Sequence, residues 1–307
     1  MKRFIAIRFI HSLIALFILS VIVFGLIRLG GDPALQFLPP DSTEEDYLLV
    51  RARLGLDKPV YVQYGIFISN AVKGDFGTSI FTRRPVIDSI KEMLPNSLKL
   101  VAASAFIAFI VAIPLGVMAA VKKDTPIDTI ARVIAGMGQS LPSFWVGLIL
   151  IELFVVVLGV LPASGMGTWK HYLMPATTLS LYILAGPIRL IRSSMLEVLD
   201  SEFIRLARIK GVSEWVVVWK HALRNSLLPV LSFSAMMLAL TVTGAVTTEV
   251  VFAWPGMGRL AYRAILGNDF PLIQGVVLTT AFMVIAANFV ADILYSYVDP
   301  RIRFGKV

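Results

Sequence analysis

The sequence predicts an all-α polytopic membrane protein with six transmembrane helices, a cytoplasmic helical hairpin and a small external region after the first helix. Of its 307 residues 57% are hydrophobic and 16% are charged, and the mean hydropathy is +0.80. Apolar runs of about 20 residues recur along the chain, and each is long enough to cross a bilayer. Lysine and arginine collect at the ends of these runs, as topology in a membrane requires.

The first predicted span covers residues 9–29 and follows a basic start that contains Lys2, Arg3 and Arg8. A basic start before an apolar run is also typical of a signal peptide. Because the run is long enough to span and no A-x-A cleavage site follows it, we expect an uncleaved helix in residues 1–29. Residues 30–99 are rich in proline and glycine and predict an external region of short helices and turns.

Five more spans are predicted within residues 100–298, and a short basic tail follows at residues 299–307. Several spans contain proline, which frees a backbone carbonyl and bends a helix, or glycine, which lets helices pack closely. We expect Gly186 and Pro187 to break the fourth span. The five predicted spans are 100–121, 134–161, 173–191, 230–251 and 272–298.

The lysine and arginine count orients these spans. Fourteen of these residues lie in the two termini and in the loops at residues 122–132 and 193–228, whereas ten lie in the opposite segments. Seven of those ten belong to residues 30–98, a segment too long for the charge bias to act strongly. We therefore expect both termini and the loop at residues 193–229 to be cytoplasmic.

Residues 200–229 form the longest polar interruption in the second half of the chain and predict a helical hairpin. Asp200 or Ser201 suits the N-cap of a first short helix, and Gly211 suits its C-terminal stop because glycine adopts positive φ. Ser213 suits the N-cap of a second helix, and Pro229 is expected to begin a new element. The pattern fits an amphipathic surface hairpin as well as a docking element for a soluble partner.

Composition excludes several classes of function. The chain has no cysteine and three histidines, and no His, Asp and Glu cluster has the spacing of metal ligands. It contains no GxxxxGK[ST] phosphate loop, so it is not expected to hydrolyse ATP. The net charge of +8 follows from topology and does not require a nucleic acid partner.

Charged residues inside spans are costly and are therefore candidates for function. Glu152 lies within the third span and is a candidate pathway residue, or it pairs with a partner subunit. For four charges near span ends we expect snorkelling or ion pairing, namely Arg28, Arg189, Glu249 and Asp292. Four polar side chains are expected to form interhelical hydrogen bonds or to line the pathway, namely Gln139, Ser140, Thr243 and Asn288.

The hairpin resembles the EAA loop of ABC-importer permeases, in which an alanine, a glycine and a closing Leu-Pro stand at fixed spacing. Ala207, Gly211 and Leu228–Pro229 match these positions, while Arg205, Leu206 and Ser226 depart from the general pattern. The departures are similar to the dipeptide, oligopeptide and nickel branch of the family. Four other stretches agree with that branch, namely LGLDKPVYVQY, KGDFGTSIFTRRPV, VVFAWPGMGRLAYRAI and NFVADILYSYVDPRIR.

The resemblance implies a permease subunit, similar to the first of two permeases, in a binding-protein-dependent importer of the bacterial inner membrane. Its partners would be a second, homologous permease, two cytoplasmic ATPase subunits that bind ATP and Mg²⁺, and an external solute-binding protein. The chain itself would bind no cofactor. The first helix of the hairpin would be the coupling helix, and the expected coupling residues are Glu202, Phe203, Arg205, Leu206, Ala207, Arg208, Lys210, Gly211, Ser213 and Pro229.

The loop between the fifth and sixth spans is expected to be a tight turn, and the resemblance places it near the docked binding protein. Its expected residues are Trp254, Pro255, Gly256, Gly258 and Arg259. The branch carries short peptides, glutathione or nickel chelates, and ISNAVKGDFG followed by RRPV resembles the glutathione importers. The rival functions are a stand-alone secondary transporter or channel, which would show matching inverted halves, and a membrane-embedded enzyme.

Overall fold

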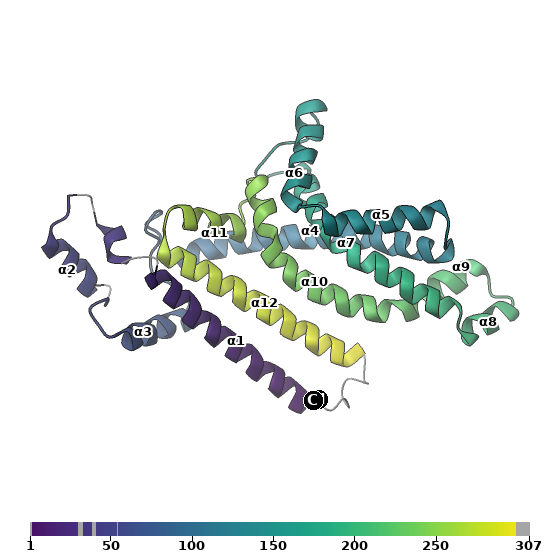
Figure 1. Ribbon diagram of the computed structural model, residues 1–307, viewed down its shortest axis with the longest axis horizontal. Helices are drawn as coiled ribbons and strands as arrows, with labels where there is room; N and C mark the ends of the chain where they lie inside the picture. The colour runs from purple at the N-terminus through teal and green to yellow at the C-terminus, as the bar shows by residue number, and fades with distance from the viewer. Residues whose placement is uncertain (1, 30–32, 39–40, 54, 299–307) are drawn as a thin grey trace.

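The computed structural model describes residues 2–29, 33–38, 41–53 and 55–298, and these residues are almost entirely helical (Figure 1). They contain no strand, apart from one isolated bridge between Thr78 and Pro85, so the all-α class is confirmed. The predicted basic tail at residues 299–307 lies outside the described residues. The helices are α1 (Lys2–Leu29), η1 (Pro33–Phe37), α2 (Glu44–Arg53), α3 (Val60–Val72), α4 (Val86–Val121), α5 (Pro126–Ser140), α6 (Ser143–Ile151), η2 (Glu152–Val157), α7 (Lys170–Leu199), α8 (Glu202–Ile209), α9 (Glu214–Val216), η3 (Val217–Ala222), α10 (Leu223–Val251), α11 (Met257–Leu266) and α12 (Phe270–Val298).

Four described helices are long and apolar enough to cross a membrane, namely α1, α4, α7 and α12. A fifth crossing is reached if the bent pair made by α5 and the helix from Ser143 to Val157 counts as one span. These two helices meet at 106°, so the third span predicted at residues 134–161 is sharply bent within its length. The break falls at Leu141 and Pro142, because proline cannot donate the hydrogen bond that would continue α5.

Three other predicted boundaries are also corrected. The second span begins at Val86 and not at Leu100, so α4 incorporates the last part of the region predicted to be external turns. The fourth span is the helix α7, which continues through Gly186 and Pro187 without the predicted break. Pro229 lies inside α10 and starts no new element, because the chain stays helical from Glu214 to Val251 through α9, η3 and α10.

The helix α7 forms the centre of the bundle and packs against α4, α5 and α10. Small residues permit this close packing: a Cβ at Gly138 on α5 would lie 2.1 Å from the Leu181 carbonyl oxygen on α7. Likewise, a Cβ at Gly116 on α4 would lie 2.8 Å from the Ile191 side chain. The predicted role of small residues in helix packing is therefore confirmed for Gly138.

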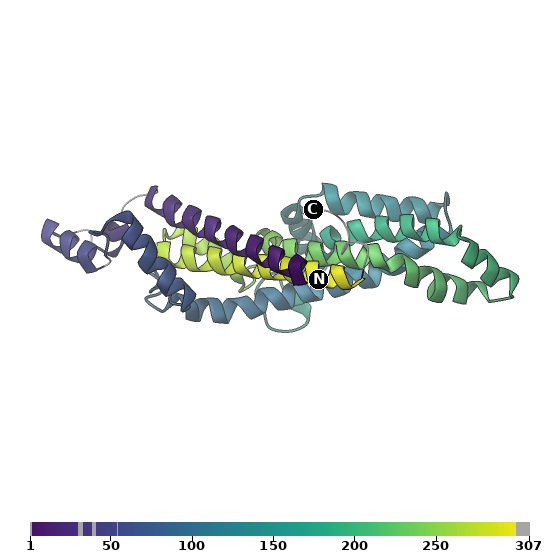
Figure 2. The ribbon, with the colours of Figure 1, turned by 90° about the horizontal axis from the view of Figure 1, so that it is seen from below.

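The helices α1 and α12 lie antiparallel to each other, and α12 in turn packs against α10 of this bundle (Figures 1 and 2). Arg8 on α1 pairs with Asp292 on α12 at 3.2 Å, which confirms the ion pair expected for Asp292. Arg28 and Arg189 bind neutral amides instead: their guanidinium groups donate to Gln63 at 2.7 Å and to Gln139 at 2.7 Å, respectively. The expected interhelical hydrogen bond of Gln139 is thus confirmed between α5 and α7.

The two ends of the bundle carry different structures. At one end α8, α9 and η3 project beyond α4, α5 and α7, and at the other end lie α2, α3 and the turn between α11 and α12 (Figure 1). The loops predicted to be cytoplasmic after α4 and after α7 meet at the first end, where Lys123 and Arg208 line one cavity. The structure therefore brings together the segments that the charge pattern assigned to one side.

Candidate functional site

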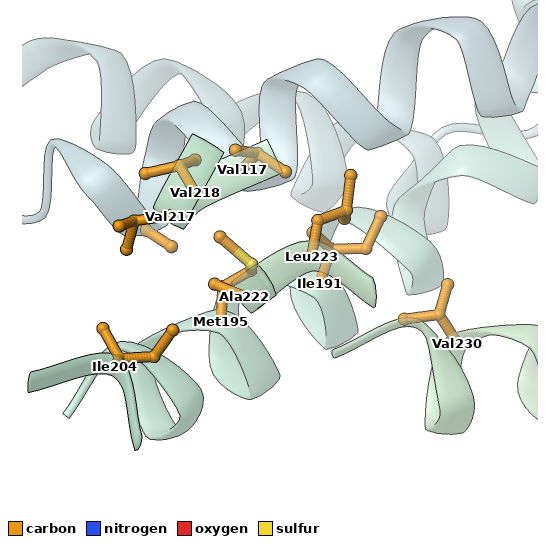
Figure 3. Close-up of a cluster of buried hydrophobic side chains, with 10 residues drawn as sticks. Val117, Ile191, Met195, Ile204, Val217, Val218, Ala222, Leu223 and Val230 are labelled. Carbon is orange, nitrogen blue, oxygen red and sulfur yellow. The ribbon is translucent and has the colours of Figure 1, made fainter. Parts of the chain in front are cut away.

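The first candidate site is the hairpin, whose first helix α8 is anchored on one side only. Ile204 is fully buried in an apolar cluster with Met195 of α7 and Val217 of η3. Figure 3 shows the Ile204 side chain pointing toward both of these residues. Ala207, on the same side of α8, also packs against this cluster. A displacement of α8 would therefore be transmitted directly to α7 and to the helix that continues into α10.

The opposite side of α8 presents large apolar side chains to the surroundings. Phe203, Leu206 and Ile209 recur at intervals of three residues, and Ile209 is 81% exposed. Trp215 on α9 is 71% exposed beside them. Exposed apolar side chains gathered in one place are typical of an interaction surface. These four residues are called the α8 surface below.

Charged residues surround the α8 surface, but one of them, Arg208, is already bound within the hairpin. Glu202 and Arg205 form a loose pair at 3.9 Å and Lys210 is exposed, so these three are available at the rim. Arg208 instead binds Glu214 through two hydrogen bonds, of 3.1 and 2.7 Å, across the turn between α8 and α9. Hydrogen bonding to Arg208 holds the pKa of the Glu214 carboxyl below its usual value. In this structure Arg208 is therefore engaged within the hairpin, whereas the other rim charges are not bound to α9.

The turn between α8 and α9 depends on Gly211. Its φ is +76°, which confirms the predicted glycine stop, and its amide donates to the Arg208 carbonyl at 3.0 Å. Ser201 and Ser213 occupy the N-cap positions of α8 and α9, as expected, with no side-chain cap hydrogen bond at either. The Ser201 hydroxyl donates backward to Val198 instead. Among the described residues the hairpin is held by Gly211, the Arg208–Glu214 pair and the buried Ile204.

The second candidate site lies at the other end of the bundle, around the turn after α10. Glu249 is fully buried there, so the expectation that it snorkels or forms an ion pair near the span end is wrong. Its carboxylate accepts hydrogen bonds from the Ser97 hydroxyl at 2.6 Å and from the backbone amides of Gly258 at 2.7 Å and Arg259 at 3.1 Å. The N-terminus of α11 thus binds the carboxylate, as helix N-termini commonly do with anions.

The residues expected in this turn pack closely against Glu249, against α10 and against α4. A Cβ at Gly256 would lie 2.4 Å from the Glu249 carboxylate, and a Cβ at Gly258 would lie 2.5 Å from the Val246 backbone. Trp254 is fully buried and donates to the Asn96 carbonyl at 3.1 Å, while the Asn96 amide donates to the Pro255 carbonyl at 2.9 Å. The turn is therefore a rigid structure built on Glu249 and α4.

Three features of this end were not expected from the sequence. The segment after Gly256 is the amphipathic helix α11 and not a plain turn. The Arg259 guanidinium binds the Ala253 carbonyl within the same turn. Asp269 is buried and accepts hydrogen bonds from the Ser79 hydroxyl at 2.5 Å and the Phe81 amide at 3.1 Å. The sequence feature that could have indicated this buried site is Glu249 itself, an acidic residue near the end of an apolar run.

Glu152 belongs to neither of these sites. It is exposed on η2, which together with α6 projects from the side of the bundle (Figure 1). Nearer the bundle centre, a cavity of about 280 Å³ opens at the break between α5 and α6. Its lining includes the polar side chains of Gln139, Ser143, Thr178, Tyr182 and Thr241.

The remaining polar candidates lie elsewhere. Ser140 is exposed at the end of α5, and Asn288 is partly buried on α12. The side chain of Thr243 lies outside the described ones. Among the described residues, no group of three or more His, Cys, Asp and Glu is placed to hold a metal ion.

Similarity to known proteins extends over nearly the whole chain. Residues 112–304 match the family described as "Binding-protein-dependent transport system inner membrane component", and residues 1–101 match the N-terminal domain of such components. The "Glutathione transport system permease protein GsiC" of Escherichia coli (strain K12) is 39% identical over 305 residues, which is 99% of this chain and 100% of the relative. The protein of the same name from Shigella flexneri serotype 5b (strain 8401) is also 39% identical over 305 residues.

A similar fold is found among solved structures. A chain of the MetNI methionine ABC transporter in an inward-facing conformation aligns with a TM-score of 0.58 and 18% sequence identity. The alignment covers 69% of this chain and 96% of that chain. A second crystal form of the same transporter aligns with a TM-score of 0.56.

Proposed function

The chain belongs to the family of binding-protein-dependent transport system inner membrane components, and on that basis we propose how it couples transport to ATP hydrolysis and what it carries. It is a non-enzymatic permease subunit of an ABC importer in the bacterial inner membrane. The rival interpretations as a stand-alone transporter and as an enzyme are therefore set aside. Such a subunit works with ATPase subunits and a solute-binding protein.

The proposed coupling element is α8, and the observation that carries the proposal is that one side of α8 is buried against the bundle while the other presents exposed apolar side chains. Ile204 fixes α8 to α7 and η3, whereas Phe203, Leu206 and Ile209 remain exposed. An ATPase subunit that covers the α8 surface would bury these side chains, and the rim residues Glu202, Arg205 and Lys210 would set its orientation. When ATP binding changes the position of the ATPase, the buried Ile204 side would carry the movement into the spans.

The substrate proposed for this importer is glutathione or a related short peptide. Full-length similarity to a relative named as a glutathione transport permease supports it, together with the stretch ISNAVKGDFG followed by RRPV. A second, homologous permease would complete the pathway. The cavity at the α5–α6 break, with its mixed polar and apolar lining, is the proposed contribution of this chain to that pathway, with Glu152 as a further candidate farther along the broken span.

The turn built on Glu249 is proposed to lie at the external end, near the docked binding protein. Pro255 and Arg259, supported from below by the buried Trp254, would then belong to a preformed contact that requires no ordering on docking. The termini and α8 would be cytoplasmic, as the lysine and arginine distribution favours.

The test is uptake and ATPase activity of the reconstituted complex with binding proteins loaded with glutathione, a short peptide or a nickel chelate. Glutathione-loaded or peptide-loaded protein is expected to stimulate ATPase activity. Gly211→Pro should abolish uptake while the complex still assembles, because proline cannot adopt the φ of +76°. Gly211→Asn is the matched control and should retain more uptake, since asparagine tolerates positive φ. Uptake by Gly211→Pro equal to wild type would contradict the coupling role.

A further inference from the structure

The helix α3 is largely apolar, with Gln63, Ser69 and Asn70 as its polar exceptions, and the protein covers it on one side only. Its 13 residues, VYVQYGIFISNAV, contain no charge, and the charges resume at Lys58 before it and Lys73 after it. None of its residues is buried, and Tyr61 and Val72 are 78% and 82% exposed. Large apolar side chains exposed on a helix without any charge are favoured in a protein core or in lipid rather than in water. Since the described residues cover α3 on one side only, its exposed side calls for another apolar environment.

The contacts between α3 and α1 place one side of α3 at membrane depth. The Tyr64 and Ser20 hydroxyls are 2.8 Å apart, and the Tyr64 ring packs edge-on against Phe17 and Phe24 of α1. Ser20 lies nine residues inside the end of the apolar span that closes at Leu29. At 1.5 Å per residue this corresponds to roughly 13 Å along the helix axis, close to the thickness of one leaflet core.

The polar residues between α1 and α3 sit where a membrane surface would lie. Arg28 is one residue before the end of α1, and its guanidinium stacks on Phe24 and donates to Gln63 of α3. The Gln63 amide donates in turn to the backbone carbonyls of Leu56 and Lys58 just before α3. Arginine near a span end extends to the head-group layer, so Arg28 and Gln63 mark that level. The rings of Tyr64 and Phe67 contact Phe24, which lies one turn farther from the end of α1 than Arg28 and therefore deeper in the span.

The neighbouring helix α2 shows the contrast. It also follows α1, but Glu44, Glu45, Asp46, Arg51 and Arg53 make it polar, as expected for a helix in water. A length of 13 residues is too short to span and is typical of interfacial or re-entrant segments. The charged composition of α2 is therefore that of a helix in water, whereas the uncharged, apolar composition of α3 is that of a helix in contact with lipid.

From these contacts we propose that α3 is embedded in the bilayer, with one side against α1 and its exposed apolar side against lipid. The partner of this surface is the acyl-chain and head-group region, continuous with the lipid-facing surface of α1. The leaflet is the external one under the orientation proposed above, but embedding itself does not depend on that orientation. Residues 60–72 would then belong to the membrane part of the protein, and not to an extramembrane region extending from residue 30 to residue 99.

The chain has no cysteine, so single cysteines can be spin-labelled without background from this subunit. The complex is reconstituted in nanodiscs of phosphatidylethanolamine and phosphatidylglycerol, with labels at Tyr61→Cys, Ile66→Cys and Val72→Cys. Leu48→Cys on α2 is the matched control for an exposed apolar residue in water, and Leu13→Cys on α1 is the control in lipid. The complex with the unsubstituted, cysteine-free chain is labelled in parallel, and it gives the background signal from the other subunits.

Collision rates of each label with oxygen, which concentrates in lipid, and with a water-soluble nickel chelate decide the question. The ratio of oxygen to nickel collisions at the three α3 positions should exceed that at Leu48→Cys, and at Ile66→Cys it should approach that at Leu13→Cys. A ratio equal to that of Leu48→Cys would place α3 in water and overturn the proposal. Low collision rates with both reagents would mean that a partner protein covers α3, which would also overturn it. Three independent positions guard against failure of a single variant.

Discussion

At the scale of single residues, the buried carboxylate of Glu249 organises the turn proposed to be external. It binds one hydroxyl from α4 and two amides from α11, and so connects three helices through one side chain. Leaving buried donors unsatisfied costs about 1–3 kcal/mol per group, which is a large share of the stability of a folded domain. The side chain of Glu249 is therefore expected to matter for structure before it matters for substrate.

Glu249→Ala is expected to lower the melting temperature of the complex and to expose the turn at residues 252–256 to proteolysis. Glu249→Gln keeps one carbonyl oxygen as an acceptor and should have a smaller effect. The control is Glu45→Gln, because Glu45 is exposed on α2 and surface substitutions change stability by about 0.5 kcal/mol or less. Thermal unfolding and limited proteolysis of the three variants check this. Equal melting temperatures for Glu249→Ala and Glu45→Gln would show that the carboxylate does not hold the turn.

At the scale of elements, the hairpin depends on contacts that cross its turn. Arg208 on α8 and Glu214 on α9 are joined by two hydrogen bonds, while Gly211 provides the positive φ between them. Both side chains are substantially exposed, so salt and water weaken the pair. Its expected role is to fix the angle of α8 relative to α9, with only a small contribution to global stability.

A double-mutant cycle with Arg208→Gln and Glu214→Gln is expected to give a coupling free energy of about 0.2–1 kcal/mol near neutral pH. The pKa of Glu214 is lowered in the folded hairpin, so this stabilisation is present above the ordinary carboxyl pKa. It is lost as the pH falls through the lowered value and Glu214 becomes protonated. Thermal unfolding of the four proteins at neutral and acidic pH measures it. A coupling that persists below the folded pKa would contradict this assignment.

At the scale of the whole molecule, four described helices, or five with the bent pair, meet the criteria of length and hydropathy for a crossing, and we propose a sixth. The proposed sixth crossing is α10, which has 29 residues and runs between the hairpin and the turn built on Glu249. With α10 counted, the chain alternates sides at each span and returns α12 beside α1. Both described ends of the chain then lie on the side of α8.

This topology predicts which single cysteines react with a membrane-impermeant maleimide added to intact spheroplasts. Asp57→Cys before α3 and Asn268→Cys between α11 and α12 are expected to be labelled, because both residues are exposed at the proposed external end. Asp124→Cys and Lys210→Cys, also exposed, are expected to be labelled only after the membrane is permeabilised. Labelling of Lys210→Cys from outside would reverse the proposed orientation and separate α8 from any cytoplasmic ATPase.

Most of the helices could be predicted, because apolar runs and glycine stops are local properties of the chain. The ends of α1, α4 and α10 at Leu29, Val121 and Val251 agree with the predicted spans, as does the stop at Gly211. Prolines were less informative. Pro142 accompanies a bend of 106°, whereas Pro187 and Pro229 lie within continuous helices. Neighbouring helices stabilise a proline-containing segment in some places and not in others, and composition does not show where.

The sequence by itself determined that this protein crosses the membrane many times, which loops carry the positive charge and which family it resembles, since hydropathy, charge and motif spacing can be read residue by residue. Only the tertiary structure decided that Glu249 is buried under the turn after α10, that Arg208 is bound to Glu214 and that Ile204 anchors α8. It also placed the apolar helix α3 against α1. These outcomes depend on contacts between residues far apart in the chain or on opposite sides of a turn. Burial and pairing are properties of those contacts, and not of the residue types alone.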